Sequence, residues 1–173
     1  MIVVETRSPQ ETRKAAGLLA KEIFKNGPTK TRAFIMALEG NLGSGKTTFV
    51  QGFAQTLGVK EKVLSPTFVL MKIYPVRSKT TESSAQPLAG TSNGVYRPVK
   101  AKKFKHLIHI DCYRLDSPKD LLHLGFDDLL KDKDAIILIE WADRVKKLLP
   151  KKSLRICFKH GKGLNNRRIE ISN

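Results

Sequence analysis

The chain has 173 residues, 40% hydrophobic and 28% charged, a composition that excludes a disordered or fibrous protein and fits one globular domain. It has no apolar run of about eighteen residues and no leader in which a basic segment precedes an apolar one, so we expect a cytoplasmic protein without a transmembrane helix. Cys112 and Cys157 lie far apart, without the paired spacing of a zinc site or a disulfide framework, and are expected to be buried thiols.

The net charge of +16 comes from two segments of the chain. Residues 75–105 contain seven Lys and Arg against one acidic residue, and residues 144–168 contain ten against none, whereas the remainder balances. Such segments attract polyanions, nucleic acids included, although they equally serve solubility. We predict one domain over 1–173 with a basic, flexible insertion at about 77–105, where Ser, Thr, Gly, Pro and basic residues show no period.

The first half of the chain predicts two units of strand followed by helix. Residues 2–5 favour a strand, and Ser8-Pro9-Gln10-Glu11 provides the N-cap and capping box of a helix that Asn26-Gly27-Pro28 ends. The nearly continuous apolar run over 33–38 is typical of a strand covered on both faces. A glycine-rich loop then leads into a helix over 46–57, with its apolar residues on one face.

The second half continues the alternation of strands and helices. The remaining predicted elements are strands over 68–74, 106–113, 135–139, 154–159 and 168–172, and helices over 118–124 and 126–130. This order predicts an α/β fold, a three-layer sandwich around a mostly parallel central sheet. In such folds the ligand lies at the carboxyl ends of the strands.

The glycine-rich loop reads Gly-Asn-Leu-Gly-Ser-Gly-Lys-Thr over residues 40–47, between an apolar strand and an amphipathic helix. Glycine lets the backbone wrap closely around a phosphate tail, so that several N–H groups point at it. Lys46 would reach the β- and γ-phosphates, and the Thr47 hydroxyl would bind Mg²⁺. This P-loop pattern predicts a P-loop NTPase-like fold that binds ATP through Asn41, Leu42, Gly43, Ser44, Gly45, Lys46 and Thr47.

Hydrolysis of ATP also needs acidic groups at the ends of neighbouring strands. Glu140 ends the clearest predicted strand and is expected to hold Mg²⁺ directly or through water. Asp111 is the second candidate, as a metal-shell ligand or the group that orients the attacking water; alternatively, it pairs with Arg114 or caps a turn. Thr67 is expected to touch the nucleotide or metal if the tripeptide 65–67 senses the γ-phosphate, and otherwise belongs to an ordinary turn.

His106 and His109 are three residues apart on one predicted strand, so their side chains point to opposite faces and cannot chelate one metal ion together. We therefore expect no zinc site. His109 is expected to pack in the core or to hydrogen-bond a neighbouring loop rather than to act as a general base.

Four blocks of sequence, in this order, resemble one family. They are residues 40–48, 65–68 (Ser-Pro-Thr-Phe), 109–115 (His-Ile-Asp-Cys-Tyr-Arg-Leu) and 139–141 (Ile-Glu-Trp). On these residues the chain resembles the TsaE family, also called YjeE, small bacterial P-loop ATPases of tRNA threonylcarbamoyladenosine synthesis. The resemblance implies a cytoplasmic protein that binds TsaD and TsaB and uses ATP hydrolysis to keep that complex turning over, without performing carbamoyl transfer itself.

The resemblance also implies roles for individual residues. The catalytic residues would be Lys46, Asp111 and Glu140, and the Mg²⁺ ligands would be Thr47 and Glu140. Thr48 and Trp141 would complete the nucleotide pocket. The segment 8–12 would approach the adenine, and Arg168 would lie near the nucleotide.

The chain departs from the family pattern at three places. The insertion replaces a short connection, Asn41 stands where aspartate is common, and Ala142-Asp143 follows Trp141 where proline and glutamate are usual. We hypothesise that the insertion contacts tRNA phosphates. Two other functions are alternatives. One is a small-molecule or nucleotide kinase, and the other is a non-catalytic nucleic-acid-binding module with a vestigial P-loop. The presence of Lys46, Thr47, Asp111 and Glu140 together argues against the second.

Overall fold

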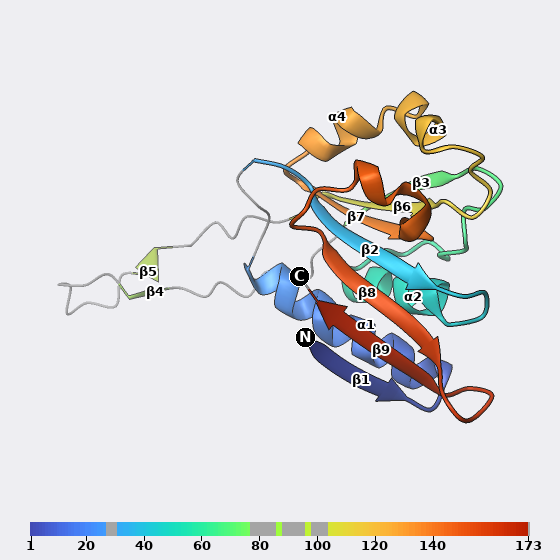
Figure 1. Cartoon of the computed structure of the whole chain (residues 1–173). Helices are drawn as coiled ribbons and strands as arrows, with labels where there is room; N and C mark the ends of the chain where they lie inside the picture. Colours follow the sequence, from blue (N-terminus) through green and yellow to red (C-terminus); the bar gives the residue numbers. More distant parts are fainter. Residues whose placement is uncertain (27–30, 77–85, 88–95, 98–103, 173) are drawn as a thin grey trace.

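A seven-stranded sheet runs through the molecule, with helices on both of its faces (Figure 1). The computed structural model describes residues 1–26, 31–76, 86–87, 96–97 and 104–172. Its elements are, in chain order, β1 (Ile2–Thr6), α1 (Pro9–Asn26), β2 (Phe34–Gly40), α2 (Lys46–Thr56), β3 (Met71–Pro75), β4 (Gln86–Pro87), β5 (Tyr96–Arg97), β6 (His106–Asp111), α3 (Pro118–His123), α4 (Phe126–Lys131), β7 (Ala135–Glu140), the 3₁₀ helix η1 (Ala142–Leu148), β8 (Leu154–His160) and β9 (Arg167–Ser172).

The strand order of the sheet is β1-β9-β8-β2-β7-β6-β3. The four central strands β8, β2, β7 and β6 are parallel to their neighbours in this group, as predicted. The outer pairs β1–β9, β9–β8 and β6–β3 are antiparallel, so that the sheet as a whole is mixed. The carboxyl ends of β2, β6 and β7 therefore meet at one edge of the sheet, where α2 begins (Figure 1).

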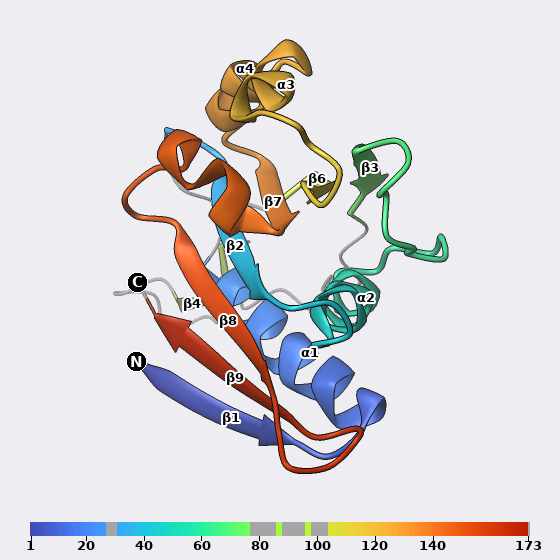
Figure 2. The same cartoon turned by 45° about the vertical axis from the view of Figure 1, so that its right-hand side comes forward.

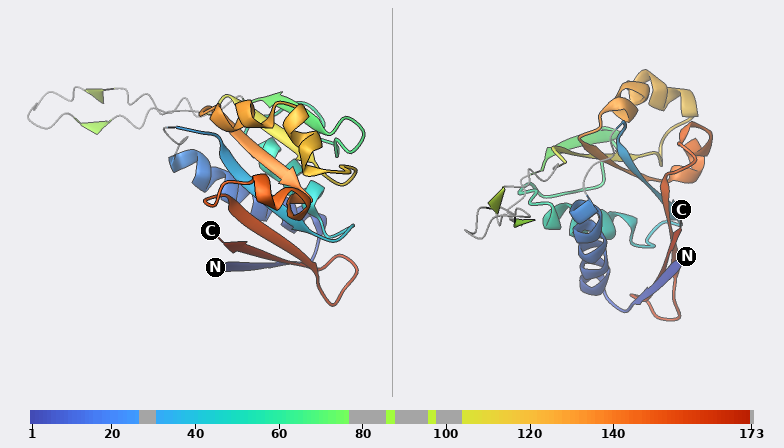
Figure 3. Two further views of the ribbon diagram at one scale, coloured as in Figure 1. Left: turned by 45° about the horizontal axis from the view of Figure 1, so that its top comes forward. Right: turned by 90° about the vertical axis from the view of Figure 1, so that its left-hand side faces the viewer.

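Side chains alternate along the central strands and so separate two hydrophobic layers. On β2, Met36 and Leu38 pack with α1 and α2, whereas Ile35 and Ala37 pack with α3, α4 and η1. Figure 3 shows these two groups of helices on opposite sides of the sheet. The predicted three-layer α/β sandwich is confirmed.

The helices α1 and α2 lie together on one face of the sheet (Figure 2). A Cβ atom on Gly52 of α2 would lie 2.4 Å from the backbone oxygen of Arg13 in α1, so only glycine allows this approach. A Cβ atom on Gly17 of α1 would lie 2.7 Å from the Thr56 side-chain oxygen. This close contact positions α2, and with it the P-loop lysine at its first residue.

The strand predicted over 68–74 begins later, at Met71. The backbone N–H groups of Val69 and Leu70 both donate to the Pro66 oxygen, at 2.9 and 2.6 Å. The apolar residues 68–70 therefore form a turn, and Phe68 is 83% exposed. Their hydrophobicity favoured a strand, but the local hydrogen bonds to Pro66 determine the turn.

Two other regions either differ from the sequence-based prediction or lie mostly outside the described residues. The 3₁₀ helix η1 was not predicted, because one buried pair, Ala142 and Val145, is too short a pattern to identify a helix. Most of the predicted insertion at 77–105 lies outside the described residues; within it, Gln86–Pro87 and Tyr96–Arg97 pair as β4 and β5.

Two further features concern the length of the helices and the state of the cysteines. In the part of the chain that the structure describes, the longest helix has 18 residues, and none has the apolar stretch that spanning a bilayer requires. Both cysteines are free thiols; Cys112 is buried as predicted, whereas Cys157 is only partly buried.

Candidate nucleotide-binding site

The glycine-rich loop connects the carboxyl end of β2 to the first turn of α2. Gly40, Gly43 and Gly45 have φ angles of 140°, 72° and 98°, which side-chain-bearing residues rarely adopt. The loop therefore turns tightly before Lys46, and α2 starts with the Phe49 N–H donating to the Gly45 oxygen at 2.9 Å. Free backbone N–H groups and the positive end of the helix dipole at this position favour a phosphate group.

A pocket of about 430 Å³ opens above this loop. Of the residues predicted from the P-loop, the two acidic candidates, Thr67 of the tripeptide 65–67 and the residues that complete the pocket, all except one line it, namely Leu42, Gly43, Ser44, Gly45, Lys46, Thr47, Thr48, Thr67, Asp111, Glu140 and Trp141. The exception is Asn41, which contributes its backbone oxygen to the loop itself. Pro9 and Thr12, in the segment expected near the adenine, also line the pocket.

The Lys46 side chain is held by backbone carbonyl groups of the glycine-rich loop. Its Nζ donates to the backbone oxygens of Gly40 at 2.6 Å and Asn41 at 3.0 Å, and lies 3.9 Å from the centre of the Trp141 ring. Burial lowers the pKa of the Lys46 ammonium, while the nearby Glu140 carboxylate opposes the shift. A buried cation with neutral acceptors is a favourable partner for a phosphate anion.

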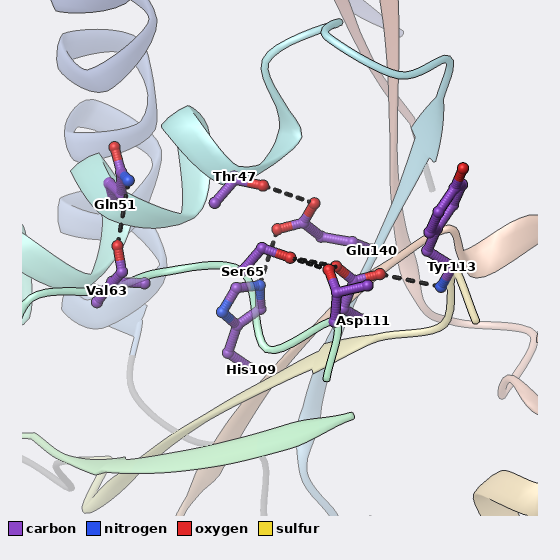
Figure 4. A network of polar contacts seen from close by, with 9 residues as sticks. Thr47, Gln51, Val63, Ser65, His109, Asp111, Tyr113 and Glu140 are labelled. Atoms are coloured by element: carbon purple, nitrogen blue, oxygen red, sulfur yellow. Dashed lines mark hydrogen bonds and ion pairs between the residues drawn. The ribbon is translucent and has the colours of Figure 1, made fainter. Parts of the chain in front are cut away.

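Glu140 links the P-loop helix to the neighbouring strand (Figure 4). Its Oε2 accepts from the Thr47 hydroxyl at 2.9 Å, and its Oε1 lies 2.8 Å from His109 Nε2. A hydroxyl and a carboxylate are hard oxygen ligands, the donor set that Mg²⁺ prefers when substrate phosphates and water complete its shell. The residues present therefore fit a magnesium ion, held by Thr47 and Glu140.

Asp111 lies beside Glu140, because the two residues are in register on the parallel strands β6 and β7. It accepts hydrogen bonds from the Ser65 hydroxyl and from the Tyr113 N–H at 2.9 Å (Figure 4). It also accepts from the Thr67 hydroxyl at 2.7 Å. Asp111 thus caps a turn, one of the two alternatives to a catalytic role. It also holds Ser65 and Thr67 in the lining of the pocket. The sequence did not indicate this contact.

The other alternative for Asp111, an ion pair with Arg114, does not occur. The Arg114 guanidinium instead lies over the Phe68 ring, 4.3 Å from its centre. This contact is a cation–π interaction on the outer side of the turn.

Trp141 has a strained backbone, with φ 57° and ψ 42°. Left-handed backbone is uncommon for a residue with a bulky side chain and occurs mostly at functional sites. The conformation places the indole ring against Lys46 and 5.0 Å from the Tyr113 ring, between centres. Because Trp141 is the single tryptophan of the chain, its fluorescence reports on this pocket alone.

The arginine that lines the pocket is Arg167, the neighbour of the expected Arg168. Arg168 faces away from the pocket and pairs with Glu170 at 2.9 Å. Arg167 lines the pocket, and its Nη2 donates to the Gly43 oxygen at 2.8 Å. Successive residues of a strand point to opposite faces, so an error of one position in register exchanges the two.

Asn165 and Tyr113 line the pocket as well and were not identified from the sequence. Asn165 belongs to the loop between β8 and β9, which no motif marks. Tyr113 lies within the block 109–115 that carries the family resemblance, and this block was the signal that pointed to it.

Comparison with known proteins identifies one family. A family model described as threonylcarbamoyl adenosine biosynthesis protein TsaE matches residues 6–84 and 93–169. The residues left unmatched between these two segments lie in the predicted insertion.

Individual relatives agree with the family model. The tRNA threonylcarbamoyladenosine biosynthesis protein TsaE of Bacillus subtilis is 32% identical over 154 residues, 89% of this chain and 75% of that protein. The protein of the same name from Rickettsia conorii is 33% identical over 143 residues, 82% of this chain and 62% of that protein. The crystal structure of Bacillus subtilis YdiB superposes with a TM-score of 0.62 at 27% identity, covering 97% of this chain and 82% of that one.

Proposed function

This chain belongs to the family of threonylcarbamoyl adenosine biosynthesis protein TsaE, and on that premise we propose that it binds and hydrolyses ATP as an accessory protein of tRNA modification. It acts in the cytoplasm on the TsaD–TsaB complex, supporting threonylcarbamoyladenosine formation at the tRNA adenosine next to the anticodon. The observation that carries the proposal is the convergence of Lys46 and Thr47 with two carboxylates, Asp111 and Glu140, in one pocket.

Lys46 and Thr47 bind the phosphate end of the nucleotide. The Lys46 ammonium leaves the neutral carbonyls of Gly40 and Asn41 for a charged phosphate oxygen, because charge-assisted hydrogen bonds are the stronger ones. Thr47 and Glu140 hold Mg²⁺, which when bound neutralises charge on the phosphate oxygens. Arg167 keeps the Gly43 peptide in place, so that the loop presents its N–H groups toward the nucleotide.

Asp111 supports hydrolysis through the tripeptide 65–67. In the structure its carboxylate is occupied by the hydroxyls of Ser65 and Thr67. We propose that Thr67 turns to the γ-phosphate when ATP binds, which frees one acceptor position on Asp111 Oδ2 for a water molecule, while the Ser65 hydroxyl still donates to the same oxygen. If the partners are needed to displace Ser65 as well, the isolated chain hydrolyses ATP slowly and TsaD–TsaB stimulates the reaction.

The test is ATP hydrolysis by the wild-type chain and by Glu140→Gln, each alone and with purified TsaD–TsaB. The substitution keeps the size of the side chain and removes its charge, and Trp141 fluorescence confirms that nucleotide still enters the pocket. Stimulated turnover that depends on Glu140 supports the proposal. ATP binding and complex formation without turnover would remove hydrolysis from the mechanism and leave a nucleotide-gated binding protein.

The two other functions give different results in the same assays. A small-molecule or nucleotide kinase would transfer the phosphate to a metabolite, and water would compete poorly. A nucleic-acid-binding module with a vestigial P-loop would bind RNA to the same extent with and without ATP. The pairing of Thr47 with Glu140 beside Asp111 argues against the vestigial P-loop.

A contact with tRNA is proposed for the basic segments. In residues 144–168, Arg155, Lys159 and Arg168 form ion pairs with glutamates. Four lysines around the turn from η1 to β8 are exposed and pair with no acidic residue that the structure describes: Lys146, Lys147, Lys151 and Lys152. Unpaired cations exposed together are suited to a phosphate backbone.

Two variants test this contact separately. Changing the four lysines to glutamine should make the negative slope of log affinity against log salt shallower by about 3, at roughly 0.7–0.9 per phosphate contact. Deleting the predicted insertion tests its share in the same way. If both variants bind tRNA with unchanged affinity and unchanged salt dependence, the basic segments serve solubility instead.

A further inference from the structure

His109 has a defined polar partner in the candidate site, although the sequence indicated only packing or a loop contact. We propose that His109 is a positioning residue, whose Nε2–H fixes the Glu140 carboxylate in the orientation that serves Thr47 and Mg²⁺. The inference rests on the proposed function, because it assigns Glu140 to the metal.

The topology brings the two side chains together. His109 on β6 is in register with Leu138 on β7, and Leu138 precedes Glu140 by two residues. Residues two apart on a strand share a face, so His109 and Glu140 point to the same side, toward α2. The side chains meet at 2.8 Å between His109 Nε2 and Glu140 Oε1 (Figure 4).

Both groups are removed from solvent, and this makes the contact specific. The His109 side chain is 0% exposed and that of Glu140 is 3% exposed. A carboxylate without donors is strongly disfavoured in such surroundings. The donors that satisfy it are the Thr47 hydroxyl on Oε2 and the His109 N–H on Oε1, so the two oxygens cannot exchange places without breaking both bonds.

The carboxylate partner identifies which nitrogen of the His109 imidazole carries the proton. A carboxylate only accepts hydrogen bonds, so His109 Nε2 must be the donor. His109 Nδ1 is buried and has no hydrogen-bond partner among the described residues. Burying an unpartnered nitrogen disfavours folding, so a purely packing role would be better served by leucine. The contact with Glu140 accounts for a histidine at this position.

Three substitutions at this position separate positioning from packing. In His109→Gln the side-chain amide nitrogen reaches the position of Nε2 and retains a donor to Glu140. In His109→Asn the amide reaches only the position of Nδ1, and His109→Leu has no donor. His106→Asn is the matched control, because His106 lies on the same strand and contacts Asp132 away from the pocket.

The measurement is the affinity for ATP, read from Trp141 fluorescence in Mg²⁺ and again in EDTA. We expect His109→Asn and His109→Leu to lose about 10- to 100-fold of the affinity that Mg²⁺ adds, the usual effect of removing a partner of a metal ligand. Affinity in EDTA should stay unchanged, and His109→Gln and His106→Asn should behave as wild type. Equal Mg²⁺ dependence in the Gln, Asn and Leu variants would overturn the inference.

Two further results keep the outcome decisive. If Glu140→Gln leaves the Mg²⁺ dependence unchanged, the metal assignment of the proposed function fails rather than the role of His109. If the Asn and Leu variants do not fold, ¹⁵N NMR of the wild-type imidazole decides. A protonated Nε2 and a bare Nδ1 in the metal-free protein support the inference, and the opposite tautomer refutes it.

Discussion

Gly52 offers the sharpest test of the packing that positions α2. In Gly52→Ala the new Cβ would lie 2.4 Å from the Arg13 oxygen and 2.5 Å from the Arg13 Cα. These are backbone atoms, so α1 and α2 must move apart. Gly17→Ala is the matched control, because the one close contact of its Cβ would be with the Thr56 hydroxyl, which can rotate away at the loss of its hydrogen bond to the Gly52 oxygen.

The magnitude follows from the difference between the two variants. Replacing glycine by alanine inside a helix stabilises it by about 1 kcal/mol, and this term is common to both. Overpacking against atoms that cannot yield costs about 1–3 kcal/mol and applies to Gly52→Ala alone. We therefore expect Gly52→Ala to be less stable than Gly17→Ala by about 1–3 kcal/mol.

Urea denaturation followed by circular dichroism measures this difference as a shift in midpoint at constant slope. Gly52→Ala should also bind ATP more weakly, because α2 carries Lys46 and Thr47 at its first turn. Equal midpoints for the two variants would refute the close contact between α1 and α2.

Three further predictions concern single side chains. Arg167→Ala should weaken ATP binding about tenfold, the equivalent of one charge-assisted hydrogen bond, while Arg168→Ala should not; equal losses would contradict the assigned register. Asp111→Asn should bind ATP normally but lose most of its hydrolysis, and normal turnover would exclude Asp111 from the reaction. Burial raises the pKa of the Cys112 thiol to about 12, so at pH 8 it is protonated; iodoacetamide should label only Cys157 in the folded protein, and rapid labelling of Cys112 would show that it is accessible.

The sequence identifies those parts of the site that lie within one short segment. The P-loop could be predicted because its glycines, Lys46 and Thr47 lie within the eight residues 40–47, and their geometry follows from the local backbone. Glu140 and Asp111 could be predicted as candidates because each follows an apolar strand. Their being neighbours depends on the pairing of β6 with β7, which the sequence does not specify.

The remaining features depend on contacts between distant segments. The choice between Arg167 and Arg168 requires the register of β9, which a shift of one residue reverses. The partner of His109, Glu140, lies on another strand, so the pattern of residues along one strand could not indicate the hydrogen bond between them. The turn at 68–70 was missed because its apolar side chains are typical of a strand, whereas hydrogen bonds to Pro66 determine the backbone.

We propose that ATP use by this chain keeps the TsaD–TsaB complex turning over. The most direct measurement is the number of tRNA molecules modified per TsaD–TsaB complex, with wild-type chain or with Lys46→Ala, at saturating ATP and tRNA. We expect many modified tRNAs per complex with the wild-type chain and about one with Lys46→Ala, because the variant lacks the group that binds the phosphates. Equal numbers with both chains would contradict it.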